Sequence, residues 1–234
     1  LQFFKDKRYI TFDQKPILII YKPQLIECLN EMLDYWDKRA KQEGLKGLIF
    51  AFQFPEWFFK KEYDASRFKY MIKFEPICSG TFMNKQTILR MNMHRIRHIY
   101  YRIFTMIFPF HKKIIKNTSE GQKELIKRDY DHVWNTILHG YTSSKMLEGA
   151  FTDWDNTARN KTGMLHIGAS PDKFGDYMTQ LVKKVNKKDK DIVIFINAWH
   201  EWGEGCYLEP DEKYGFDYLK KLKFALESND AFPR

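Results

Sequence analysis

The chain has 234 residues, of which 44% are hydrophobic, and this proportion favours one folded domain with a sizeable core over a disordered segment. Its net charge of +9 is compatible with an anionic partner, but no nucleic-acid-binding motif accompanies the charge, so a lysine-rich solubilising surface is the favoured interpretation. Three unevenly spaced cysteines indicate neither a disulfide framework nor a zinc site, which favours a reducing, cytoplasmic location. The chain begins with Leu1 and shows neither a signal-peptide pattern nor an apolar run long enough to span a bilayer. We interpret it as the C-terminal portion of a longer protein.

The first third of the chain predicts a strand, a helix and a second strand. Residues 16–21 (PILIIY) form a continuous apolar run, as expected for a parallel strand covered on both faces. In residues 24–43 apolar side chains recur at spacings of three and four, and Gly44 supplies a stop signal, which predicts a helix. Residues 46–52 (KGLIFAF) predict a second buried strand.

The remainder predicts further alternation of helices and strands. Helices are predicted at 119–138, with Ser119 as the N-cap, at 171–185 and at 211–226, and strands at 149–152 and 191–196. This alternation indicates βαβ units with right-handed crossovers. Because a complete (β/α)8 TIM-type barrel needs about 250 residues, we predict an α/β fold with the C-terminal half to two-thirds of such a barrel. A doubly wound open sheet is the alternative, although no Gly-rich phosphate loop follows an early strand.

We predict a single domain over residues 1–234, interrupted by an inserted helical section at about 81–118. Residues 81–116 mix basic and aromatic side chains. The favoured interpretation is a helical subdomain that packs its aromatic residues on the barrel. A peripheral membrane contact or a patch for anionic glycans is the alternative, and a nucleic-acid partner is not expected.

Two glutamates follow the predicted strand at 191–196, within the segment 197–210 (NAWHEWGEGCYLEP). Catalytic groups of barrel enzymes lie at the carboxyl ends of strands. Glu201 and Glu204 are three positions apart, and the neighbouring glycines allow a compact turn, so both carboxylates can face one cavity. Glycoside cleavage needs such a pair, one protonated and one ionised. We therefore predict Glu201 and Glu204 as catalytic residues.

Aromatic side chains surround this pair, and aromatic faces bind the apolar faces of sugar rings. Trp199, Trp202 and Tyr207 are predicted to contact a glycan substrate. His200 is predicted either as a proton shuttle in the same site or as a hydrogen-bonded structural residue.

A second segment, DWDNTAR at residues 153–159, follows the strand at 149–152 and is expected on the same face of the barrel. Trp154 is predicted to stack on a sugar, and Asp155, Asn156 and Arg159 to hydrogen-bond its hydroxyls. The alternative is a turn in which Asp and Asn side chains hold the backbone. Metal binding by an Asp-x-Asp pair is the weaker interpretation, and neither a metal nor a cofactor is expected.

Two other residues carry weaker signals. Tyr21 follows the first predicted strand, which allows a substrate contact but is also common at strand ends. Glu209 precedes Pro210 at the predicted start of the last helix, where a capping or first-turn carboxylate is the plainer interpretation.

The run NAWHEWGEGCYLEPDEKYGFDYL resembles the signature of the WbsX-type family of polysaccharide-biosynthesis proteins, which is similar to glycoside hydrolase family 99, the endo-acting α-mannosidases. FDQKPILIIYKP at residues 12–23 and GAFTDWDNTARN at residues 149–160 agree with this resemblance. It implies a TIM-type barrel and a polysaccharide or oligosaccharide of mannose-like sugars as the substrate.

The resemblance also implies roles for the two glutamates. Glu201 takes the position of the base that acts on the sugar 2-hydroxyl to give an anhydro-sugar, and Glu204 that of the general acid and base at the glycosidic oxygen. The hydrolases have a histidine where this chain has Gly203. Because WbsX-type proteins are usually described as glycosyltransferases of O-antigen or capsule assembly, both cleavage and transfer with retention stay open. A glycan-binding module without activity is the other alternative.

Overall fold

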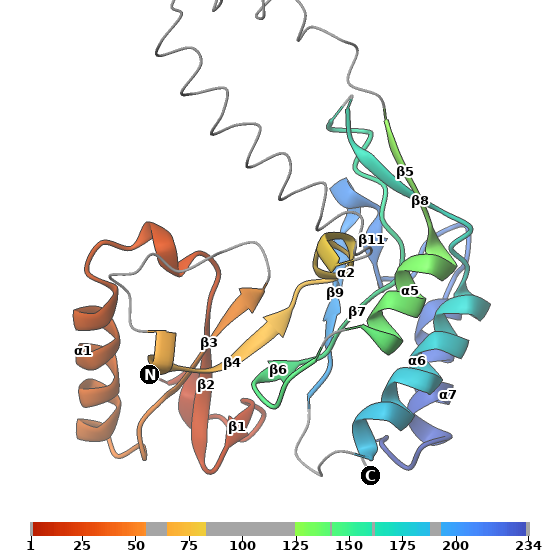
Figure 1. The fold of residues 1–234 in the computed structure, drawn as a ribbon. Helices are drawn as coiled ribbons and strands as arrows, with labels where there is room; N and C mark the ends of the chain where they lie inside the picture. Colours follow the sequence, from red (N-terminus) through yellow and green to blue (C-terminus); the bar gives the residue numbers. More distant parts are fainter. Residues whose placement is uncertain are drawn as a thin grey trace, which may run out of the picture.

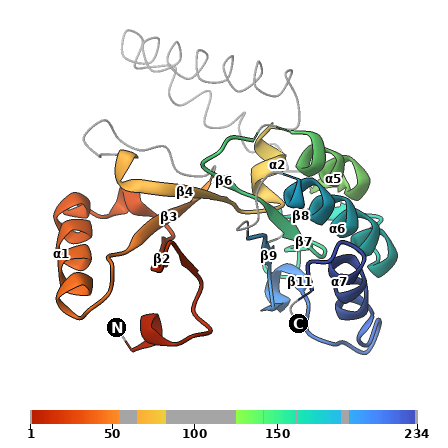
Figure 2. The ribbon, with the colours of Figure 1, turned by 90° about the horizontal axis from the view of Figure 1, so that it is seen from below.

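The computed structural model describes residues 2–54, 65–82, 125–140, 142–160, 162–187 and 193–232. These residues form an α/β half-barrel, in which a curled, mainly parallel sheet carries helices on its convex face (Figures 1 and 2). The strands of the curled sheet are β1 (Thr11–Phe12), β2 (Lys15–Ile20), β3 (Ile49–Phe54), β4 (Phe68–Lys73), β6 (Met146–Leu147), β7 (Gly149–Phe151) and β9 (Phe195–Asn197).

The parallel strands follow one another around the sheet in chain order. β2, β3, β4 and β6 pair in parallel, while β1 pairs antiparallel with β2. β7 continues β6 after Glu148 and pairs in parallel with β9. The amide of Phe195 donates to the carbonyl of Glu148 at 3.0 Å, so the pairing extends across the junction of β6 and β7. A series in which each strand lies beside the next one in the chain is the arrangement of a (β/α) barrel.

Both faces of the sheet are covered by apolar side chains, which explains why β2 and β3 read as continuous apolar runs. Along β3, Ile49 and Ala51 join one cluster with residues of β2, β4 and β6. Phe50 and Phe52 alternate with them and pack against α1 (Leu29–Gln42), which connects β2 to β3. The alternation is the ordinary two-residue period of a strand.

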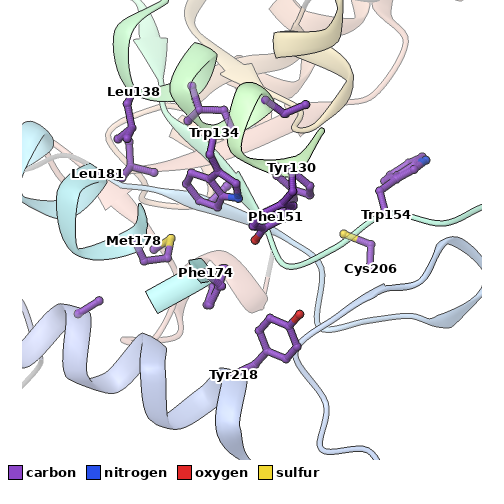
Figure 3. Packing of buried hydrophobic residues seen from close by; sticks show 14 of the residues in the cluster. Tyr130, Trp134, Leu138, Phe151, Trp154, Phe174, Met178, Leu181, Cys206 and Tyr218 are labelled. Carbon is purple, nitrogen blue, oxygen red and sulfur yellow. The ribbon is translucent and has the colours of Figure 1, made fainter. Parts of the chain in front are cut away.

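The larger core lies between β7 and the helices α5 (Tyr130–His139), α6 (Pro171–Asn186) and α7 (Asp217–Glu227) (Figure 3). Trp134 of α5 stacks on Phe151 of β7 with ring centroids 5.6 Å apart, and its ring also stacks on Tyr177 of α6 at 5.4 Å. Phe174 meets Tyr218 of α7 edge-on at 5.4 Å. Burying each such side chain stabilises the fold by about 1.5–3 kcal/mol, so this cluster is the main anchor of the C-terminal half.

A buried ion pair joins the sheet to α6. The ammonium of Lys73 in β4 lies 2.7 Å from a carboxylate oxygen of Glu148, and both side chains are about 5% exposed or less. Lys184 of α6 approaches the other oxygen of Glu148 at 3.2 Å. Burial of these charges is offset by mutual pairing, and the pKa of Glu148 is lowered because the attraction of the two lysines outweighs its desolvation.

The remaining elements are short. β5 (Ile126–Asp129) pairs in parallel with β8 (Met164–Ile167), and β10 (His200–Glu201) forms a hairpin with β11 (Cys206–Tyr207). One α-helix, α2 (Ile77–Phe82), and four 3-10 turns complete the described elements: η1 (Phe3–Lys5), η2 (Pro23–Leu25), η3 (Ala65–Arg67) and η5 (Trp202–Glu204). Across the described ranges, no helix combines the length and apolarity needed to cross a bilayer.

Most strands predicted from sequence are present, as β2, β3, β7 and β9, and the helix predicted at 171–185 is α6, with Ser170 as its N-cap. The helix predicted at 24–43 begins only at Leu29. The strands that no prediction covered are β4 and β8 and the two-residue strands β1, β6, β10 and β11. Of the predicted insertion, residues 83–118 lie outside the described residues, so a membrane contact through residues 81–116 stays a prediction.

Two predicted helices were partly wrong. Residues 126–129 form a strand rather than part of the helix predicted at 119–138, and α5 begins at Tyr130 because the Asp129 side chain caps it by accepting from the amide of His132 at 2.8 Å. Ser119, the predicted cap, lies outside the described residues. The last helix begins at Asp217 rather than at 211, because the Asp211 side chain and carbonyl close a turn with the amides of Tyr214 and Gly215.

Candidate functional site

The two segments predicted to carry chemistry meet at the carboxyl ends of β7 and β9. These strands are parallel neighbours, so the chain leaves both at the same edge of the sheet. The amide of Asp155 donates to the carbonyl of Glu204 at 2.7 Å and joins the two segments directly. The structure therefore brings residues 153–159 and 199–209 together, as the order of strands predicts.

The β10–β11 hairpin sets the direction of the two glutamates. Glu201 pairs with Cys206 across the hairpin, and η5 places Glu204 at its tip. Gly205 closes the tip with a φ of +60°, and a Cβ there would also lie 3.2 Å from the amide nitrogen of Asp155. Cys206 is fully buried and its thiol donates to the carbonyl of Asn197 at 2.8 Å, which fixes the base of the hairpin to β9.

Arg159 links the two carboxylates. One guanidinium nitrogen donates to Oε1 of Glu204, and another lies 3.9 Å from Oε1 of Glu201. The Glu204 side chain is 14% exposed and that of Glu201 is 44% exposed. Burial raises the pKa of Glu204, Arg159 lowers it, and the charge of Glu201 raises it, with a net upward shift. The two glutamates thus share one cation but differ in burial.

Two tryptophans stand at the surface beside this pair. Trp199 is 53% exposed and Trp202 is 49% exposed. The Trp202 ring stacks on Tyr207 with centroids 3.8 Å apart, and its indole N–H donates to Glu209 at 2.7 Å. This bond corrects the predicted capping role of Glu209, which lies well before the first turn of α7. His200 is exposed on β10, and its role stays open.

In the segment after β7, residues 153–159, the side chains of Asp155 and Asn156 hold a turn and Trp154 is buried. Asp155 accepts from the amide and hydroxyl of Thr157 at 2.9 and 2.6 Å, and Asn156 accepts from the amide of Met164 at 2.8 Å. These contacts are those of the alternative interpretation, in which Asp and Asn side chains hold a turn. Trp154 is only 3% exposed and belongs to the aromatic core (Figure 3), so its burial is at odds with the predicted stacking on a sugar.

Tyr21 lies just beyond β2, at the opposite end of the parallel series from β9. Its side chain is 54% exposed, and the ammonium of Lys22 lies 4.9 Å from its ring centroid. Its predicted substrate contact stays a prediction.

Sequence reasoning gave no role to two acidic groups near the same edge of the sheet, the buried Glu75 and the half-buried Asp153. Glu75, after β4, is 1% exposed, and burial raises its pKa to about 7 although Ser79 and Lys73 oppose the shift. Its carbonyl accepts from the Asn197 side chain at 3.0 Å, and both residues line a cavity of about 150 Å³ on the concave face. Burial similarly raises the pKa of Asp153 to about 6. The position of Asp153 after a predicted strand was the available signal, whereas Glu75 follows a strand that was not predicted.

Among the residues that the structure describes, no three His, Cys, Asp or Glu side chains are grouped so as to hold a metal ion. The candidate site therefore consists of carboxylates, one guanidinium and aromatic rings. Paired carboxylates and exposed aromatic rings at the strand ends of an α/β half-barrel are typical of carbohydrate-active proteins.

The comparison with protein families agrees with this class. The model of the family described as "Glycosyltransferase WbsX" matches residues 1–222, and the chain belongs to this family. The family resemblance noted from the sequence motifs is thereby confirmed.

The individual proteins that the chain matches share little sequence identity with it. The chain is 22% identical over 228 residues to "Uncharacterized protein WxcX" from two strains of Xanthomonas campestris pv. campestris, in matches that cover 96% of the chain and 29% of those relatives. A solved structure of a "Glycoside hydrolase-like protein" is similar over 95% of the chain and 57% of its own length, with 13% identity and a TM-score of 0.48. The chain thus spans less than a third of the length of these curated relatives.

Proposed function

We propose that this chain carries the catalytic carboxylates of an enzyme that cleaves or transfers glycosidic bonds in a mannose-like surface polysaccharide. The observation that carries the proposal is the pair Glu201 and Glu204, which share Arg159 but differ in burial. Membership of the WbsX family supports a glycan as the substrate. The exposed rings of Trp199 and Trp202 supply apolar faces for sugars next to the carboxylates.

The unequal environments of the two glutamates support the roles that the family resemblance implies for them. Glu204 is the more buried, and its raised pKa suits a group that holds a proton and donates it to the departing glycosidic oxygen. Glu201, which is more open to substrate, takes the proton of the sugar 2-hydroxyl. The 2-oxygen then attacks the anomeric carbon as its bond to the leaving oxygen breaks, which gives a 1,2-anhydro-sugar.

The second step determines whether the outcome is cleavage or transfer. Glu204, now ionised, takes a proton from water or from an acceptor hydroxyl, whose oxygen attacks the anomeric carbon. Glu201 returns its proton to the 2-oxygen as the three-membered ring opens. Two displacements at one carbon retain the configuration, and the same residues serve hydrolysis and transglycosylation.

We further propose that the half-barrel is part of a complete TIM-type barrel and that the chain belongs to one such domain. The parallel series β2, β3, β4, β6–β7 and β9 amounts to five of the eight strands that such a barrel requires. Ile19 of β2 is 40% exposed and lines the same cavity as Glu75 and Asn197, as expected of a barrel interior that further strands would close.

The test uses the full-length protein with α-mannan and other surface polysaccharides, alone and with oligosaccharide acceptors. Wild type is compared with Glu201→Gln and Glu204→Gln, which keep side-chain shape and remove the charge. We expect a product of retained configuration by NMR from wild type and at least a hundredfold slower turnover from each variant. Glycan binding without turnover in wild type, lost on Trp199→Ala but kept in both Gln variants, would instead identify a glycan-binding module.

A further inference from the structure

A second hollow adjoins the candidate site on the far side of Trp202. It has a volume of about 600 Å³ and is open to solvent. The residues that shape it come from η5, the end of β11 and the turn before α7, and they include Trp202, Tyr207, Asp211, Glu212, Lys213 and Phe216. Its volume lies within the range of about 300–1,000 Å³ that is usual for ligand sites.

The aromatic wall of this hollow is held in place before any ligand binds. Trp202 is fixed on one face by its stack on Tyr207 and at its N–H by Glu209. The Tyr207 hydroxyl in turn donates to Asp211 at 2.9 Å. About half of the Trp202 surface nevertheless stays exposed, so the ring is a rigid platform whose free surface faces solvent.

The turn before α7 adds a further ring to the lining of the hollow. Asp211 accepts from the amides of Tyr214 and Gly215 and holds the turn, and Gly215 has a φ of +53°. Phe216 follows and is 60% exposed directly before α7. The ring of Phe216 lines the hollow, so its apolar face is available to a ligand there.

The polar residues of the hollow identify the kind of ligand. Asp211 and Glu212 supply hydrogen-bond acceptors, and Lys213 supplies donors, with its ammonium 4.5 Å from the Tyr214 ring centroid. Aromatic faces combined with directional acceptors and donors match a sugar ring, which has apolar C–H faces and a rim of hydroxyls. Two carboxylates against one ammonium disfavour an acidic sugar.

We infer that this hollow is a subsite for a neutral hexose unit that lies one or more sugars away from the bond processed at Glu201 and Glu204. The inference rests on the proposed function, because Trp202 is common to the hollow and to the candidate active site. The subsite makes affinity depend on oligosaccharide length. A disaccharide occupies the carboxylate site alone, whereas a longer chain also reaches Phe216.

The test measures binding of α-linked manno- and gluco-oligosaccharides of two to five units to the full-length protein by titration calorimetry, with turnover followed in parallel. The variant is Phe216→Ala. The matched control is Phe224→Ala, because Phe224 lies in the same helical region and is 62% exposed but does not line the hollow. We expect Phe216→Ala to weaken binding of the four- and five-unit chains about fivefold and to leave the two-unit chain unchanged. The control should bind all lengths like wild type.

Two other outcomes are distinguishable. If wild type binds and turns over the oligosaccharides but Phe216→Ala binds every length equally well, the subsite is absent and the proposed function stands. If wild type neither binds nor turns over any oligosaccharide in the panel, the proposed function fails and the subsite fails with it.

Discussion

Arg159 and Glu204 are 45 positions apart in the chain, yet the guanidinium of one donates directly to the carboxylate of the other. The pairing exists because β7 and β9 are parallel neighbours and release their following segments at one edge. An arginine beside a carboxyl lowers its pKa, whereas burial of Glu204 raises it, and the burial effect is the larger. Arg159 therefore limits the rise in the pKa of Glu204, the proposed general acid.

Replacing Arg159 with Met should raise the pKa of Glu204 further, because the opposing positive charge is removed. A general acid acts only when protonated, so the alkaline limb of the rate–pH profile should move to higher pH. Arg159→Lys keeps the charge and should leave the limb nearer its wild-type position. The profile of kcat/KM for the full-length protein measures this. A shift to lower pH in Arg159→Met would show that Glu204 is not the group that titrates.

Glu75 predicts a pH-dependent stability. Its pKa is raised from 4.5 to about 7 in the folded protein, so the folded state holds a proton that the unfolded state releases between these values. Its contribution to the free energy of unfolding should therefore fall as pH rises from 4.5 to 7, by up to about 3 kcal/mol. Glu75→Gln lacks this titration, so its stability relative to wild type should increase over that window. Urea unfolding at pH 5 and pH 7.5 compares the two, and a constant difference would contradict the account.

The Lys73–Glu148 pair predicts strong coupling between two residues 75 positions apart. Glu148→Gln leaves the buried Lys73 ammonium without its carboxylate and should cost about 3 kcal/mol. The double variant Lys73→Met with Glu148→Gln removes both charges, so it should lose much less stability than the sum of the losses of its two single variants. Chemical denaturation of the single and double variants gives the coupling free energy. Purely additive effects would indicate that the pair contributes nothing as a pair.

The two glycines of the hairpin tip should differ in tolerance. Gly205 has a positive φ and lies close to Asp155, so Gly205→Ala should destabilise the protein by about 1–2 kcal/mol and slow turnover. Gly203 has no such strain, and a methyl group at this position would meet only the side chains of Glu201 and Arg159, at 3.6 and 3.7 Å. Gly203→Ala should therefore fold normally. Thermal melting of the two variants checks this, and equal losses would contradict it.

The features that the sequence predicts well are those with a local signal. β2 and β3 are apolar on both faces, and the pair Glu201 and Glu204 lies shortly after a strand. These strands and this pair can therefore be predicted from the sequence alone. β4 was missed because Lys69 and Lys73 interrupt its apolar pattern. The partner that allows Lys73 to be buried, Glu148, is far away in the chain and gives no local signal.

In the candidate site, too, features with a local sequence signal were predicted and contacts between distant residues were not. Arg159 was identified as a polar residue near the substrate, but its contact with both glutamates depends on the pairing of β7 with β9. Trp154 carries the same sequence signal as Trp202, a tryptophan beside acidic residues after a strand. One is buried in the core cluster and the other is half exposed, and this difference depends on tertiary packing that has no local sequence signal.

The most direct test of the assigned roles uses aryl α-mannosides with leaving groups of different basicity, together with the full-length protein. A leaving group that departs without a proton needs no general acid. The account predicts that an activated substrate restores the first step in Glu204→Gln, measured as the rate of the initial burst of released phenol, to near the wild-type rate. Glu201→Gln stays inactive, because the attack by the 2-oxygen still needs a base. Equal rescue of both variants, or of Glu201→Gln alone, would contradict it.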